Sequence, residues 1–569
     1  MIDESAYLDE LARIRARTWP GSVPSEVRYP LGERPLSDYL RHWGEARGDA
    51  AAIIYYGREI SYRELDGNSE RFANVLKGLG IAKGDRVAVF LPNCPQFHFA
   101  FFGILKLGAI HVPISPLSRE YELSYQLRDA GATVLVTLDS LMPVVRGVRD
   151  EVPLKAVFAT GLSQMLPEHP TLPVPSAVAA APQECPDAED FLAAIRSASA
   201  ERCTGADLDS IAALNYTGGT TGMPKGCIHT QRDMVFTGAA NWSVAMQGDE
   251  SIVWLSYFPE FWIAGENAAL IFPVITGRPL VLMTRWDPQA LLEAIARYRV
   301  THMALMVDGA VELMEHPGFD RFDLSSLRRV RVTSFVKKLN VGYRERWFAL
   351  TGVTLTESSW GMTETHTSNT FTTGMQDDDF DLKVQPVFVG MPIPGTDFKI
   401  CDFDTGAILP LDAEGEIVVR TPALFKGYWN KPEETAAALR DGWLYTGDIG
   451  VIDGLGFLHY LGRRKEMLKV KGMSVFPAEL EALIGKHPAV AGSGVIGREA
   501  EDKGQVPVAF VQLKPEHVGE VSAGDIDRWL RDHVAAFKVP EVHLIDALPM
   551  TPTGKVKKTE LAPLLDAAD

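Results

Sequence analysis

The sequence is poor in cysteine, and its few cysteines lie far apart. The five positions are Cys94, Cys185, Cys203, Cys227 and Cys401. No CxxC pair occurs among them, so the sequence indicates neither a disulfide framework nor a zinc site. A reducing, cytoplasmic location is the expectation that fits this cysteine usage.

Positive charge is also in short supply. The chain has 56 Lys and Arg against 74 Asp and Glu, a formal net charge of -18. Such a surplus of acid repels polyanions and lacks the basic footprint of a nucleic-acid-binding protein. Any phosphate-bearing ligand must therefore be held by local groups.

Long apolar runs are missing as well. The segment MIDESAYLDELARIRARTWP mixes acids and bases and has no apolar core, so we expect no signal peptide. The most apolar stretch, residues 97–114, is interrupted by His98 and Lys106 and is too polar for a membrane span. A buried helix that leads into a strand is the better interpretation.

The length and the pattern of the chain predict an α/β protein of two domains. A single core rarely serves 569 residues. Strand and helix signals alternate over residues 51–137, which favours βαβ units and a largely parallel sheet. After Gly462 the pattern becomes a short α/β module. We therefore predict a large N-terminal domain, residues 1–463, and a small mobile domain, residues 464–569.

A glycine-rich and threonine-rich loop, YTGGTTGMPKG, spans residues 216–226. Glycines allow backbone N–H groups to curl round phosphate oxygens, hydroxyls add donors, and Lys225 supplies positive charge. The loop does not fit the Walker pattern, because Pro224 precedes Lys225 where a Walker helix begins. A phosphate-binding loop of another geometry is indicated, although a surface turn is the alternative for this motif by itself.

Further motifs follow in a fixed order. They are SSWGMTET (358–365), GEIVVRTPALFKGYWNKPEET (415–435), GWLYTGDIG (442–450), GRRKEMLKVKGMSVFPAELE (462–481) and PMTPTGKVKK (549–558). Together with the loop they resemble the adenylate-forming superfamily, which includes acyl-CoA synthetases, nonribosomal-peptide adenylation domains and firefly luciferase. The likeness covers nearly the whole chain. It implies the adenylate-forming fold and an enzyme that uses ATP and Mg²⁺ to join a carboxylic acid to coenzyme A.

The resemblance also implies a nucleotide site. Trp360 would lie against adenine, Asp448 would accept hydrogen bonds from the ribose hydroxyls, and Glu364 would hold Mg²⁺. Lys225, Thr363, Glu364 and Lys555 would act on the reacting phosphates. The implied nucleotide-binding residues are Thr217, Gly218, Gly219, Thr220, Thr221, Gly222, Lys225, Trp360, Gly361, Thr363, Asp448, Arg463 and Lys555.

The enzyme that the resemblance implies carries out two reactions at one site, activation of the acid and transfer of the acyl group. A domain must therefore move between them. The resemblance implies that Lys555 reaches the α-phosphate during adenylation and that the small domain then rotates about Lys465. Rotation would present Gly472 and Lys469 to coenzyme A. For Lys465 and Lys555, an exposed, solvated lysine is the plain alternative.

The acid-binding part departs from the family pattern. Where many relatives have small residues, this chain has Phe335 and Val336, and Trp262 replaces a frequent histidine. These three residues are the predicted acyl pocket, and they favour an apolar medium-chain, long-chain or bulky acid; core packing is the alternative for Trp262. Lys337 would suit a polar acid, but a lysine at the exposed start of a helix is the plainer interpretation.

Two other functions stay open at this stage. The adenylate can pass to the pantetheine of a separate acyl carrier protein instead of coenzyme A. A non-catalytic nucleotide-binding scaffold is the remoter alternative, which the presence of Lys225, Glu364, Asp448 and Lys555 disfavours.

Overall fold

A computed structural model provides the three-dimensional structure of the chain. It describes residues 2–217, 223–246, 251–357, 360–384, 387–470, 473–500, 504–551 and 554–565. In these ranges, no helix is both long enough and apolar enough to cross a membrane.

A first seven-stranded sheet has the order β7-β6-β5-β3-β4-β8-β9 and is parallel except for the hairpin of β8 and β9. The strongly apolar stretch forms α4 and β4, all of whose residues are buried, as expected from the sequence. Lys106 is tolerated inside α4 because its ammonium nitrogen lies 3.2 Å from the Glu70 carboxylate. The strands are β3 (Arg86–Phe90), β4 (Ile110–Pro113), β5 (Val134–Leu138), β6 (Ala156–Thr160), β7 (Glu189–Asp190), β8 (Ile211–Tyr216) and β9 (Gly226–Thr230).

A second seven-stranded sheet has the order β14-β13-β12-β10-β11-β1-β2. All its pairs are parallel except the predicted hairpin of β1 and β2. The strands are β1 (Ala51–Tyr55), β2 (Arg58–Ser61), β10 (Trp254–Ser256), β11 (Leu280–Leu282), β12 (His302–Met306), β13 (Arg329–Thr333) and β14 (Leu355–Glu357). The prediction of βαβ units is confirmed by these two sheets.

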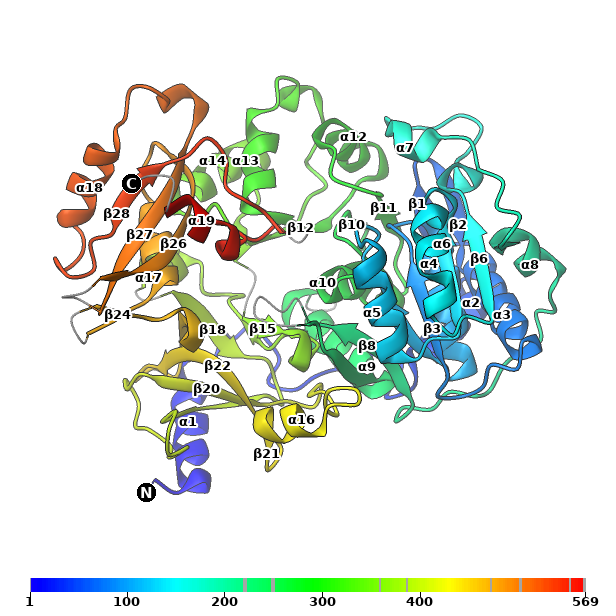
Figure 1. Cartoon of the computed structure of the whole chain (residues 1–569), viewed down its shortest axis with the longest axis horizontal. Coiled ribbons are helices and arrows are strands. Elements are labelled where there is room, and N and C mark those ends of the chain that lie inside the picture. The colour runs from blue at the N-terminus through cyan, green and yellow to red at the C-terminus, as the bar shows by residue number, and fades with distance from the viewer. Residues whose placement is uncertain are drawn as a thin grey trace.

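Helices join and cover the two sheets (Figure 1). Ser61 caps the helix that follows it by accepting a hydrogen bond from the Glu64 backbone N–H, and Asp287 caps α12 in the same way. The helices are α1 (Glu4–Thr18), α2 (Leu36–Ala46), α3 (Tyr62–Gly78), α4 (Pro95–Leu107), α5 (Glu120–Ala130), α6 (Met142–Val148), α7 (Ser176–Ala179), α8 (Phe191–Ser197), α9 (Gln231–Asn241), α10 (Ile263–Gly265), α11 (Phe272–Thr276), α12 (Pro288–Tyr298), α13 (Val307–Glu315), α14 (Val341–Thr351), α15 (Phe380–Lys383) and α16 (Pro432–Ala438).

A third sheet is antiparallel and has the order β17-β18-β23-β22-β20-β19, with β21 paired to β22. It carries two of the motifs, because β22 contains Asp448 and β23 ends at Arg463. Its strands are β17 (Thr370–Phe371), β18 (Phe388–Pro392), β19 (Asp397–Cys401), β20 (Gly415–Arg420), β21 (Leu439–Arg440), β22 (Trp443–Ile452) and β23 (Leu458–Arg463). A small hairpin, β15 (Gly361–Met362) with β16 (Thr367–Ser368), lies apart from it.

The last part of the chain forms a separate five-stranded sheet, in which β25-β24-β27-β26 are consecutive and β28 pairs with β27. Its core includes Leu480, Ile484, Ile526 and Leu530, and the predicted α/β module is present. The strands are β24 (Leu468–Val470), β25 (Met473–Val475), β26 (Val490–Ala500), β27 (Gly504–Leu513) and β28 (Glu541–Leu544), and the helices are α17 (Pro477–Ile484), α18 (Ala523–Arg531) and α19 (Ala562–Leu565). The predicted boundary at 463/464 falls where β23 ends, and it stays a prediction.

Candidate functional site

The ends of the phosphate loop are held together at the carboxyl end of β8. Tyr216 pairs with Gly226, and the Thr217 N–H donates to the Lys225 carbonyl oxygen at 2.9 Å. The Lys225 N–H in turn donates to the Thr217 hydroxyl at 3.2 Å. The carboxyl ends of strands are where open α/β sheets bind ligands. Five predicted loop residues lie outside the described residues: Gly218, Gly219, Thr220, Thr221 and Gly222.

Tyr428 connects this loop to the predicted metal ligand. The Lys225 ammonium lies 4.3 Å from the centre of the Tyr428 ring, and the Tyr428 hydroxyl donates to a Glu364 carboxylate oxygen at 2.7 Å. Burial, and next the Glu364 anion, raise the pKa of Tyr428, so the phenol remains a donor. Lys225 and Glu364 are therefore brought together through a residue to which the sequence analysis gave no role.

A buried histidine holds the Thr363 segment in place. The His229 Nε2 atom lies 2.7 Å from the Thr363 carbonyl oxygen and donates to it. His229 and His366 are fully buried, and their rings meet edge to face at 4.7 Å. Thr363 and Glu364 lie in the short 3-10 turn η7 (Thr363–Thr365), which these contacts fix.

The adenosine residues of the prediction meet where β22 and β23 pair. The Trp360 indole N–H donates to Asp448 at 3.0 Å, and the Arg463 Nε lies 2.9 Å from the other Asp448 oxygen. Burial raises the pKa of Asp448 to about 6, against the opposing effect of Arg463. Gly361 is required beside them, since a Cβ there would lie 1.9 Å from the Thr367 carbonyl oxygen.

Trp360 is itself buried, with its ring edge against Phe398 at 5.4 Å. This environment orients the indole toward Asp448. Stacking of Trp360 on adenine stays a prediction.

Lys555 reaches the same place from the far end of the sequence. Its turn is closed by two hydrogen bonds, from the Thr551 N–H to the Lys555 carbonyl oxygen at 2.7 Å and from the Lys555 N–H to the Thr551 hydroxyl at 3.0 Å. The ammonium group lies 4.9 Å from the centre of the Phe335 ring. The surrounding protein atoms, and next the Arg463 guanidinium, lower the pKa of Lys555, while Asp448 opposes this change.

The predicted hinge and coenzyme A residues lie just beyond the third sheet. Lys465 is exposed in the turn η9 (Arg464–Glu466), which begins directly after β23. Lys469 is exposed on β24, and its ammonium donates to the Ser474 hydroxyl at 2.9 Å. Gly472 lies outside the described residues, and all three roles stay predictions.

The structure brings together only part of the predicted acyl pocket. Trp262 lies 6.2 Å from Phe335 between ring centres and 6.1 Å from Phe258. Val336 has other neighbours, because it packs against the C-terminal cluster that contains Val508, Phe510, Leu548 and Leu561.

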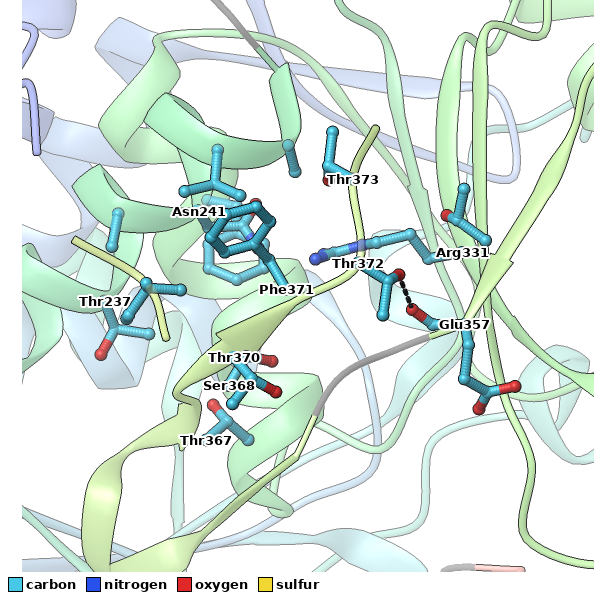
Figure 2. Close-up of a pocket in the computed structure, with 16 residues that line it drawn as sticks. Thr237, Asn241, Arg331, Glu357, Thr367, Ser368, Thr370, Phe371, Thr372 and Thr373 are labelled. Atoms are coloured by element: carbon cyan, nitrogen blue, oxygen red, sulfur yellow. Dashed lines mark hydrogen bonds between the residues drawn. The ribbon is translucent and has the colours of Figure 1, made fainter. Parts of the chain in front are cut away.

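A cavity of about 40 Å³ lies next to β13 and β14 (Figure 2), and Glu357 in its wall accepts hydrogen bonds from Ser334, the residue before Phe335. It is lined by residues that the sequence analysis did not select, among them Asn241 and Arg331. The signal for Arg331 was available, since a basic residue between two valines is unusual in a strand of a buried parallel sheet. Tyr428 belongs to the motif at residues 415–435, whereas no sequence pattern indicated His229.

Comparison with known proteins agrees with this geometry. A family model described as AMP-binding enzyme matches residues 40–429, and the AMP-binding enzyme C-terminal domain matches residues 479–555. A long-chain-fatty-acid–CoA ligase of Bacillus subtilis (strain 168) is 32% identical over 95% of this chain and 96% of its own. A 4-coumarate–CoA ligase of Oryza sativa subsp. japonica is 30% identical over 94% and 95%.

Solved structures show the same fold. The anthranilate CoA ligase AuaEII in complex with anthranoyl-AMP superposes with a TM-score of 0.81 at 27% identity, over 94% of this chain and 98% of its own. The predicted fold class and the resemblance are therefore confirmed. The shared motifs, the joined parts of the site and these matches show that the chain belongs to the AMP-binding enzyme family, the adenylate-forming enzymes.

Proposed function

We propose that this protein is an AMP-forming acid–thiol ligase. It joins a carboxylic acid to AMP with release of pyrophosphate, and then transfers the acyl group to coenzyme A. The observation that carries the proposal is the position of Lys555, which comes from the C-terminal part of the chain and lies among Phe335, Arg463 and Asp448. The Lys555 side chain is exposed, and its position over the Phe335 ring is what distinguishes it from a lysine elsewhere on the surface.

In the adenylation step, a carboxylate oxygen of the acid attacks the α-phosphorus and the bond to pyrophosphate breaks. Negative charge grows on the phosphate oxygens, so fixed donors and cations accelerate the step. Lys555 is placed to bridge the carboxylate and the α-phosphate, and Lys225 and Thr217 belong to the loop that holds the leaving phosphates. Thr363 adds a hydroxyl beside them.

Glu364 fits a magnesium site. Mg²⁺ usually takes one or two carboxylates and completes its shell with water and substrate phosphates, so a single glutamate next to the phosphate loop suffices. The Tyr428 hydroxyl at 2.7 Å leaves the other carboxylate oxygen of Glu364 available. When bound, the ion would neutralise charge on the phosphates; Tyr428 orients the carboxylate that would hold it.

In the second step, the thiol sulfur of coenzyme A forms a bond to the acyl carbon, AMP leaves, and the thiol proton is lost. We assign Lys465 as the hinge about which the C-terminal part turns, so that Lys555 withdraws and Lys469 and Gly472 approach. The position of Lys465, directly after β23 and before β24, supports this assignment.

We propose that the acid has an apolar body. Trp262, Phe258 and Phe335 form an aromatic group next to Lys555. The names of the relatives, which are ligases for long-chain fatty acids and 4-coumarate, agree with such an acid.

Carboxylate-dependent exchange of labelled pyrophosphate into ATP, run over a panel of acids, tests the first step. We expect exchange with at least one acid, and release of AMP during turnover. Absence of exchange with every acid, or release of ADP, would reject the proposal in favour of a nucleotide-binding scaffold. A second assay with coenzyme A and acyl carrier protein as alternative acceptors tests the thiol, and coenzyme A is expected to be used.

A further inference from the structure

The cavity next to β13 and β14 has a strongly polar wall. Of the 16 lining residues, seven carry a hydroxyl group: Thr237, Thr356, Thr367, Ser368, Thr370, Thr372 and Thr373. Asn241, Arg331 and Glu357 add an amide and two ionisable groups, and the remaining six are apolar. A cavity of about 40 Å³ has room for about three water molecules or one carboxylate group, not for a long apolar tail. Thr370 and Thr372 already bond the protein backbone, so the charge of Arg331 is the feature of this wall that points to a ligand.

Arg331 is the one cation of this wall. It lies on β13 between the buried Val330 and Val332, so the strand alternation turns its side chain to the opposite side, where the cavity lies. Figure 2 shows the guanidinium reaching across the cavity toward Asn241 and Phe371. With the Asn241 amide oxygen turned to face it, that oxygen accepts hydrogen bonds from Nη1 at 2.9 Å and Nη2 at 3.1 Å.

Within the described ranges, no carboxylate balances this charge. Among the residues that the structure describes, Arg331 has no ion-pair partner. Glu357 lines the same cavity, but its carboxyl group accepts hydrogen bonds from the Ser334 N–H and hydroxyl at 2.9 and 2.6 Å. In Figure 2 the Glu357 carboxyl points away from the guanidinium.

The two groups also differ in charge at neutral pH. Burial, and next the nearby Arg329, lower the pKa of Arg331 to about 10, so it remains a cation. Burial raises the pKa of Glu357 to about 7, so this carboxyl group is only partly ionised. Arg331 is half-buried. A partly desolvated cation with no anion beside it among the described residues is costly, and an anion supplied by a ligand would reduce that cost.

The other walls come from helices that depart from α geometry. α9 continues into the π-helical segment η4 (Trp242–Met246), and η5 (Glu266–Ile271), also π-helical, precedes Phe272. Asn241 and Val244 line the cavity on one of these helices and Phe272 on the other. Such π segments occur frequently at functional sites, where they re-aim side chains.

We propose that this cavity binds the far end of the acid, and that Arg331 pairs with a second carboxylate there, so that the preferred substrate is a dicarboxylic acid with an apolar middle. This inference rests on the proposed function. Arg331 lies on β13, which ends at Thr333, and Phe335, whose ring the Lys555 ammonium faces, follows two residues later. At about 3.3 Å per residue, the two ends of the acid are separated by roughly 7 to 13 Å, which favours a dicarboxylate of medium length.

Pyrophosphate exchange with matched pairs of acids tests the inference on the wild-type protein. The pairs are adipate with hexanoate, suberate with octanoate, and sebacate with decanoate; the monomethyl ester of suberate removes only the second charge. We expect kcat/KM for suberate to exceed that for octanoate and for the monomethyl ester by about 30-fold or more, the usual effect of a buried charge pair. Equal or higher values for the monocarboxylates would overturn the inference.

Arg331→Met keeps the length of the side chain and removes the charge. We expect this variant to lose the preference for suberate, with a kcat/KM for octanoate at least equal to that of wild type. An unchanged suberate-to-octanoate ratio of kcat/KM would overturn the inference. Asn241→Leu removes only the amide that orients Arg331. It is expected to lower the suberate-to-octanoate ratio of kcat/KM by a smaller factor than Arg331→Met does. The test therefore does not depend on the folding of one variant.

The two proposals fail in different ways. Exchange with monocarboxylates and not with dicarboxylates would reject the dicarboxylate preference alone. Absence of exchange with every acid would reject the ligase function itself.

Discussion

The Lys555 ammonium nitrogen lies 4.9 Å from the centre of the Phe335 ring, although 220 positions separate the two residues in the sequence. Phe335 follows β13 of the second sheet, and Lys555 belongs to the C-terminal part. Their contact joins the two parts across the site. This arrangement is the one that the proposed adenylation step needs.

Lys555→Ala should therefore stop the first step. Loss of one donor aimed at developing charge costs about 2.7 to 4 kcal/mol, or roughly 10² to 10³ in rate. Transfer from a supplied acyl-AMP to coenzyme A should stay within about twofold of wild type, because the proposed rotation withdraws Lys555 for that step. Single-turnover assays of each step provide the measurement, and an equal loss in both would mean that the lysine has another role.

Gly492→Ala should separate the two parts without touching a catalytic group. A Cβ at Gly492, on β26, would lie 2.2 Å from Val336 Cγ1, closer than packed atoms tolerate. We expect adenylation to fall by about tenfold while acyl transfer is kept, and the double variant Gly492→Ala/Val336→Ala to recover adenylation.

Gly497→Ala is the matched control for this change. Its Cβ would meet Leu468 Cδ2 at 2.6 Å, inside the C-terminal part. It should lower the melting temperature and affect both steps alike. A double variant at positions 492 and 336 that stays as slow as the single variant would contradict the explanation.

Asp448 should make nucleoside binding depend on pH. Its pKa, about 6, lies above the ordinary value because the carboxylate is buried, and Trp360, Arg463, Glu364 and Lys555 are the groups that act on it. Ribose hydroxyls donate to the ionised form, so affinity for adenosine should fall about tenfold for each pH unit below about 6. Adenosine is the suitable ligand, because AMP has a phosphate that titrates in the same range.

The same raised pKa has an opposite effect on stability. The folded protein holds the Asp448 proton more tightly than the unfolded chain, so this residue destabilises the fold as pH rises from about 4 through about 6. Asp448→Asn should thus match or exceed wild type in melting temperature at neutral pH, yet bind adenosine weakly and without the pH dependence. A variant that loses stability at neutral pH would contradict the assigned cause of the shift.

Tyr428 has two separable contacts. Tyr428→Phe keeps the ring near Lys225 and removes the hydroxyl that donates to Glu364, so adenylation should slow by about tenfold, the usual effect of a hydrogen bond to a charged group. Tyr428→Leu also removes the ring and should slow the step by a further factor of about three or more.

Tyr445→Phe is the control for the Tyr428 variants. The Tyr445 ring lies under the Arg440 guanidinium at 4.4 Å, away from Glu364. The adenylation rate of Tyr445→Phe should equal that of wild type. Equal rates for Tyr428→Phe and wild type would show that the hydroxyl does not orient Glu364.

The sequence by itself determined the family and the parallel α/β architecture, and it predicts the residues that face the nucleotide. Those features depend on local patterns: alternation of strands and helices, glycines where backbones approach closely, and motifs whose order is visible in the chain. The Thr217–Lys225 loop and the Asp448 and Lys555 motifs could be read in this way because the residues of each motif are neighbours in sequence.

Only the tertiary structure decided which distant groups meet. His229 lies under Thr363 and Tyr428 against Glu364 because separate sheets pack together, and no local pattern carries that information. Val336, expected beside the acid, packs on the C-terminal sheet. The charge facing the cavity comes from Arg331, since strand alternation and the helices around it, not the neighbouring residues in sequence, set what a side chain on β13 meets.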